Sequence, residues 1–108
     1  MYKLVRDNIP ELINAQDGQV ADFAEIKNDQ FYLKALNSKL IEECNEYLAS
    51  GNIEELVDVV TVINYIVAAR GTSKEDFKKM YGDKLNNLGG FNKRYLLFLP
   101  DNAAKQNK

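Results

Sequence analysis

The sequence is that of one small, slightly acidic domain. Its 108 residues carry 14 Lys and Arg against 16 Asp and Glu, which gives a net charge of −2 and a pI near 5.1. General nucleic-acid binding is excluded, because it requires a basic surface. The chain has no His and one Cys, so an internal disulfide is impossible and a zinc or thiolate metal centre is disfavoured.

Two features argue against export and membrane insertion. The first residues, MYKLVRDN, are charged where a signal peptide has its apolar region. The longest nearly apolar stretch, Val59 to Ala69, is too short and too polar to span a bilayer. We therefore expect a cytoplasmic protein without a membrane partner.

The predicted domain comprises residues 1–99, and it begins with a short helix. Pro10 suits the first turn of a helix that runs through Glu11 to about Gln16, and Asp17-Gly18 ends it. Residues 19–26 alternate weakly between polar and apolar side chains. That segment is predicted to be either an edge strand or a loop.

An antiparallel helical hairpin is the main predicted feature. Asn28 or Asp29 caps its first helix, which extends to about Ser50, and the chain reverses at Gly51-Asn52. Its second helix, residues 53–70, is apolar nearly all round, which is typical of a helix in the interior.

A third long helix and a C-terminal segment complete the domain. Thr72 or Ser73 caps the helix, which ends near Leu88 at two glycines. Residues 94–99 read RYLLFL and are a candidate strand that pairs with residues 20–26 or packs on the bundle. Residues 100–108 are expected to be a frayed polar tail. The predicted class is mainly α, with a helical hairpin inside a small bundle. A minor β-hairpin at the edge of the bundle is an open alternative.

Two pairs of carboxylates lie at matched heights on the predicted hairpin. Glu43 and Glu46 are three residues apart on the first helix. Glu55 and Asp58 have the same spacing on the second, so each pair shares a helix face. If the chain reverses at Gly51, the members of each cross-helix pair differ in height by only about 1.5 Å. The four side chains are therefore expected to converge on one point.

Asp58 is the most informative of the four, because its helix is otherwise nearly apolar. A buried ionised carboxylate is destabilising by several kcal/mol unless it is paired or binds a metal. Oxygen ligands without His suit Mg²⁺, with Mn²⁺ as the alternative. A different interpretation is that Glu42, Glu43 and Glu46 form the solvated face of an amphipathic helix. The matched height of Asp58 favours the metal site.

Three blocks of the sequence resemble one known family. Glu42-Glu43-Cys44-Asn45-Glu46 followed by Glu55-Leu56-Val57-Asp58 resembles the EExxE and ExxD motifs of the all-α NTP pyrophosphatase superfamily. That superfamily includes MazG-like proteins and phosphoribosyl-ATP pyrophosphohydrolase. KLVRDNIPELI (Lys3 to Ile13) and GGFNKR (Gly89 to Arg94) are similar to a branch described as predicted house-cleaning NTP pyrophosphatases. The likeness runs from about residue 2 to residue 99, although the branch commonly has Lys in place of Asn8.

The resemblance implies an enzyme that hydrolyses a nucleoside triphosphate to the monophosphate and pyrophosphate. It implies Mg²⁺ held by Glu43, Glu46, Glu55 and Asp58. Glu42 would be a second-metal ligand or a base for the attacking water, so the implied catalytic residues are Glu42, Glu43 and Glu46. Phosphate groups need cations, and the candidates are Lys3, Arg6, Lys84 and Arg94, each weighed against being an ordinary surface charge. The apolar helix faces predict a homo-dimer or homo-tetramer.

Two alternatives stay open. Phosphoribosyl-ATP in histidine synthesis would keep the reaction and change the substrate. A non-catalytic helical dimer would instead use its acidic face to bind a basic partner. In that case Asp58 would pair with a Lys or Arg from the same chain or from a second chain.

Overall fold

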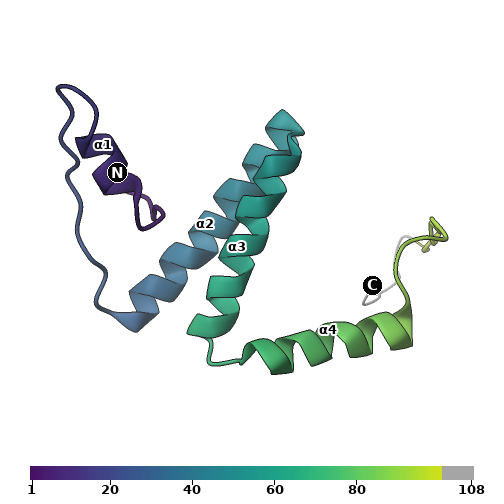
Figure 1. Cartoon of the computed structure of the whole chain (residues 1–108). Coiled ribbons are helices and arrows are strands. Elements are labelled where there is room, and N and C mark those ends of the chain that lie inside the picture. Colours follow the sequence, from purple (N-terminus) through teal and green to yellow (C-terminus); the bar gives the residue numbers. More distant parts are fainter. Residues whose placement is uncertain (101–108) are drawn as a thin grey trace.

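The computed structural model describes residues 1–100 and contains four helices (Figure 1). These are α1 (Ile9–Asn14), α2 (Asp29–Ser50), α3 (Ile53–Ala69) and α4 (Lys74–Leu88). The mainly α class is confirmed. Within the described residues there is no strand, so residues 19–26 form a loop and residues 94–99 do not pair with them. The predicted polar tail lies, from Asp101 onward, outside the described residues.

The predicted caps define the ends of the long helices. The Asn28 side chain accepts a hydrogen bond from the Phe31 amide at 2.8 Å, and the Ser73 hydroxyl accepts one from the Asp76 amide at 3.1 Å. Gly51 adopts a left-handed conformation with φ +70°. Glycine adopts this conformation without steric cost, so α2 can end there and α3 can begin two residues later.

α2 and α3 lie side by side and antiparallel, whereas α4 leaves the hairpin (Figure 1). The chain bends by 116° between α3 and α4. The residues before α2 form a separate arm that carries α1 and turns back toward the hairpin. None of the described helices is by itself long and apolar enough to cross a membrane, although α3 and α4 meet the length and composition criterion as a bent pair.

The single chain buries few of its apolar side chains. Leu36 on α2 and Val62 on α3 are the buried apolar residues of the described chain, with 4% and 8% of their surfaces exposed. The radius of gyration is 18.6 Å, whereas a compact chain of this length has about 13 Å. The prediction that α3 is an interior helix is therefore wrong for its outer face. One chain offers α3 only α2 as a close neighbour along its length, which leaves Val57, Val60 and Tyr65 exposed.

Candidate metal centre

The carboxylates of the hairpin form two overlapping groups of three. Oxygen atoms of Glu43, Glu55 and Asp58 lie within 4.8 Å of one another, and so do oxygen atoms of Glu42, Glu43 and Glu46. The first group joins α2 and α3, as the matched heights predict. Glu46 belongs to the second group only, so the four expected ligands do not converge on one point. Three helical residues turn through about 300°, which rotates Glu46 about 60° away from the inward direction of Glu43.

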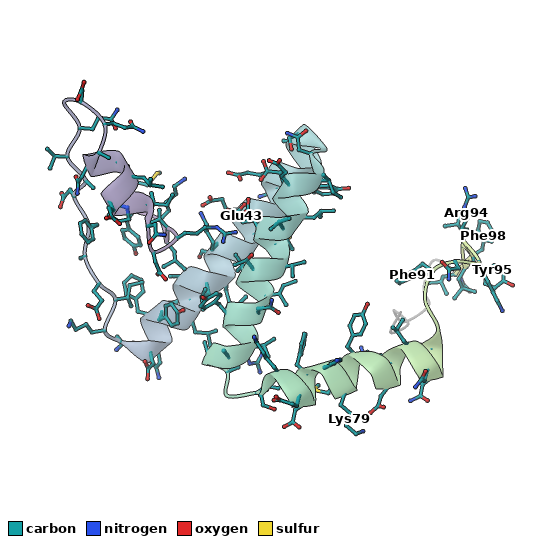
Figure 2. The ribbon with its side chains drawn as sticks, viewed as in Figure 1. Glu43, Lys79, Phe91, Arg94, Tyr95 and Phe98 are labelled. Carbon is teal, nitrogen blue, oxygen red and sulfur yellow. The ribbon has the colours of Figure 1, made fainter. Side chains whose placement is uncertain are left out.

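Glu43 is common to both groups and is the one buried charged residue of the described chain, with 5% of its surface exposed. It lies between the N-terminal segment and α3 (Figure 2). Its Oε1 atom is 3.2 Å from Lys39 Nζ, but its Oε2 atom is buried without a hydrogen-bond partner. Leaving such an atom unpaired is destabilising by about 1–3 kcal/mol. This oxygen is therefore available to a further ligand that enters the cross-helix group.

Burial raises the pKa of the Glu43 carboxyl, and the hydrogen bond and charge of Lys39 offset this only in part. The negative charges of Glu46 and Asp58 raise it further. Burial lowers the pKa of Lys39, but its hydrogen bonds to Glu42 and Glu43 and their charges outweigh that effect and raise it. Lys39 therefore stays protonated beside the two glutamates.

Lys39 is a site residue that the sequence analysis missed. Its ammonium lies 2.9 Å from Glu42 Oε2 as well as 3.2 Å from Glu43 Oε1, and its side chain is 15% exposed. The signal was present in the sequence, because Lys39 precedes these glutamates by three and four residues, which are the spacings of neighbours on a helix. Lys3 approaches the same Glu42 Oε2 atom at 3.8 Å.

Asp58 already has a partner within the chain. Arg6 Nη2 donates to Asp58 Oδ1 at 2.6 Å and to the Thr61 hydroxyl at 3.3 Å. The Thr61 hydroxyl in turn donates to the Val57 carbonyl at 2.8 Å. The pairing that a carboxylate on an apolar helix requires is thus made by the N-terminal segment, and it is the pairing that the non-catalytic alternative expects.

Lys84 and Arg94, the other two expected phosphate-binding cations, lie far from these carboxylates. Lys84 is on α4, which bends away from the hairpin. Arg94 follows that helix in a turn with φ +59°, and Figure 2 places it at the tip of the chain beyond α4, far from Glu43 on the hairpin. A single chain therefore brings only Lys3 and Arg6 of the four to the carboxylates.

A cavity of about 210 Å³ adjoins the cross-helix carboxylates. Its α2 wall is formed by side chains at helical spacing, namely Tyr32, Leu36, Lys39 and Glu43. The α3 wall has the same character, with Asp58, Thr61, Val62 and Tyr65. The N-terminal segment covers the cavity through residues 4–7. Glu43 and Asp58 thus face a partly enclosed space rather than open solvent.

The chain matches no protein-family model, and no curated protein or solved structure is significantly similar to it.

Proposed function

We propose that this protein is a Mg²⁺-dependent nucleoside triphosphate pyrophosphohydrolase that acts on non-canonical nucleotides, with Glu43, Glu55 and Asp58 as the metal ligands. One observation carries the proposal. The buried, unpartnered Oε2 atom of Glu43 belongs to a residue whose carboxylate meets two carboxylates from the neighbouring helix within 4.8 Å. Three carboxylates in such a group suit a hard divalent cation, Mg²⁺ first and Mn²⁺ second.

The donor set fits the chemistry of phosphate transfer. When bound, Mg²⁺ lowers the pKa of a coordinated water and offsets negative charge on phosphate oxygens. Glu42 is engaged by Lys39 and Lys3. Glu46 is exposed and makes no ion pair with another described residue. Glu46 is thus the better candidate to accept a proton from the attacking water, and Glu42 to hold the two ammonium groups near the phosphates.

Arg6 would have two roles at this site. A divalent cation at the cross-helix group competes with the Arg6 guanidinium for Asp58. Once released, the guanidinium lies next to the bound phosphate chain, and its planar set of donors can hold two phosphate oxygens at once. In the absence of a cation, Arg6 offsets the charge of Asp58 and keeps the carboxylates together.

A subunit assembly is the second part of the proposal. The chain exposes 10149 Å², about 4,000 Å² more than a compact monomer of 12.3 kDa. Stable interfaces bury about 800 Å² per partner, and obligate ones bury more. We propose a homo-dimer or homo-tetramer that covers the outer face of α3 and the apolar face of α4. Only such an assembly would allow Lys84 and Arg94 to reach a carboxylate group, that of a second copy.

A non-catalytic module that binds a basic partner is the second candidate. The Arg6–Asp58 ion pair favours it, because Asp58 is satisfied without a metal. In this candidate the exposed carboxylates of α2, rather than the cavity, would be the binding surface.

The deciding experiment is a pyrophosphate-release assay over a panel of standard and damaged nucleoside triphosphates, with phosphoribosyl-ATP included. Each substrate is assayed with Mg²⁺, with Mn²⁺ and with excess chelator. Cation-dependent release of pyrophosphate supports the hydrolase, and the preferred substrate separates house-cleaning from histidine synthesis. Absence of release across the whole panel would favour the non-catalytic module.

A further inference from the structure

The cavity beside the carboxylates has two chemically different ends. Glu43 and Asp58 lie at the charged end. Tyr32 is three turns before Glu43 on α2, and Tyr65 is two turns after Asp58 on α3. Because the helices are antiparallel, both tyrosines lie at the same, opposite end, which we call the tyrosine end. Asp58 and Tyr65 are separated by about 10 Å along the axis of α3.

The tyrosine end combines aromatic rings with the carboxylate of Asp7, which makes no ion pair with another described residue. Leu36 and Val62 are buried and line the cavity between its two ends. Tyr32, Tyr65 and Asp7 all line the cavity. Burial raises the pKa of the Tyr32 hydroxyl, and the charges of Tyr65 and Asp7 raise it further. Asp7 belongs to the N-terminal segment that covers the cavity.

The size of the cavity restricts what can enter it. Pockets that enclose a whole small-molecule ligand measure about 300–1,000 Å³, whereas this cavity measures about 210 Å³. It can therefore enclose one planar ring system, whereas the phosphate chain of a nucleotide would extend from its charged end beyond the cavity. The separation of its two ends is comparable to that between the base and the phosphate chain of a nucleotide.

We propose that the tyrosine end binds the base of the nucleotide, with Tyr32 and Tyr65 as ring contacts and Asp7 as the residue that selects the base. This rests on the proposed function, because the phosphate chain would occupy the charged end. Aromatic side chains stack on any base, so the rings supply affinity. An ionised carboxylate accepts hydrogen bonds and cannot donate them. Asp7 therefore favours a base edge with adjacent N–H donors, as in guanine and other 2-amino-6-oxopurines, over adenine.

Binding of GMP without turnover is the first test. The chain has no Trp, so its intrinsic tyrosine fluorescence reports a base that stacks on the rings, and calorimetry measures the dissociation constant. Tyr65→Leu should weaken GMP binding about five- to tenfold, the lower part of the range for base stacking, and Tyr65→Phe should restore it. Tyr65 is 54% exposed, so these substitutions leave the fold intact, which circular dichroism checks.

The matched control is Tyr95→Leu. Tyr95 is also exposed and lies at the far end of the molecule from Glu43 (Figure 2), so GMP binding should not change. Equal affinities of the wild type and Tyr65→Leu would overturn the stacking role, whatever the outcome of the pyrophosphate assay.

Base selection is the second test. Among damaged nucleotides, the wild type should have a higher kcat/KM for 8-oxo-GTP than for 8-oxo-ATP, whose base lacks the adjacent N–H donors of a 2-amino-6-oxopurine. Asp7→Asn should reduce that preference about fivefold, because an amide presents a donor to the N–H groups. Turnover with an unchanged ratio of kcat/KM for 8-oxo-GTP to that for 8-oxo-ATP in Asp7→Asn would overturn the selecting role of Asp7 and leave the proposed function standing. If the wild type releases no pyrophosphate but binds GMP in a way that depends on Tyr65, the proposed function is overturned and this inference is supported.

Discussion

Two regions differ in what their side chains contact. One is the charged end of the cavity on the α2–α3 hairpin, and the other is the C-terminal arm, which we define as α4 with residues 89–100. At the charged end, Arg6 bonds to Asp58 across 52 residues of sequence, and Lys39 lies between two glutamates. Along this C-terminal arm, the apolar side chains other than Phe77 are exposed. The ion pair of Lys79 with Asp83 lies within α4 itself. Phe91, Tyr95 and Phe98 extend away from the rest of the chain (Figure 2).

Both regions contain capped helices, so helix formation does not explain the contrast. An N-terminal cap and apolar residues repeated at helical spacing are enough to form α4. They do not supply the surface against which its apolar face packs. The charged end is organised by contacts within one chain, whereas the exposed apolar side chains of the C-terminal arm are those that the proposed assembly would cover. Five tests address this distinction, from the largest expected effect to the smallest.

Glu55→Gln and Asp58→Asn should each reduce Mg²⁺-dependent pyrophosphate release to background, because each removes a carboxylate from the cross-helix group. The helical circular dichroism should be unchanged. Glu54→Gln is the matched control, since Glu54 is an exposed neighbour outside both carboxylate groups. Full activity in both variants, measured beside Glu54→Gln, would refute the assignment of the metal ligands.

Leu36→Ala should lower the free energy of unfolding by about 2–4 kcal/mol, because it deletes a buried side chain from the contact between α2 and α3. Leu12→Ala on α1 is the control. Leu12 is exposed, so its truncation should cost less than about 0.5 kcal/mol. Urea denaturation followed by circular dichroism measures both, and equal midpoints would contradict a core located between α2 and α3.

Leu85→Lys should dissociate the proposed assembly. Leu85 lies on the apolar face of α4 and is exposed in the single chain, so a charge there matters only if another copy covers it. Light scattering on a size-exclusion column gives the mass of the wild type and of the variant. A monomeric wild type would show that this face has another occupant or none.

Arg6→Gln should tighten divalent-cation binding about three- to tenfold, because it removes the competitor for Asp58, and should raise KM for the nucleotide. Mn²⁺ binding measured by electron paramagnetic resonance separates the first effect from the second. Lys27→Gln is the control, because the Lys27–Glu25 contact is exposed and remote from the carboxylates. Weaker Mn²⁺ binding in Arg6→Gln would contradict competition between the guanidinium and the cation for Asp58.

Lys79→Ala should have almost no effect. Its pair with Asp83 is exposed and spans four residues of one helix, and such pairs contribute about 0.3–0.5 kcal/mol. The melting temperature should fall by less than about 3 °C, with the mass in solution unchanged. A larger loss of stability, or a change in mass, would mean that the polar face of α4 is also part of an interface.

The sequence by itself determined the features that depend on short separations along the chain. Asn28, Gly51 and Ser73 predict the helix ends because a cap acts on residues within one turn. The height match of Glu43 with Asp58 follows from a constant helical rise and one reversal. The same arithmetic fails for Glu46, whose carboxylate depends on rotation about the helix as well as on height.

Tertiary structure decided which residues far apart in the sequence are in contact and which side chains are removed from water. Arg6 meets Asp58, and the N-terminal segment covers the cavity, only when the residues before α2 fold back onto the hairpin. Lys39 lies half-buried beside two glutamates, and a tertiary contact is needed to remove it from water. Residues 94–99 have a strong strand pattern but no partner strand in the described chain. A strand requires a second backbone for its hydrogen bonds, and a periodic pattern cannot provide one.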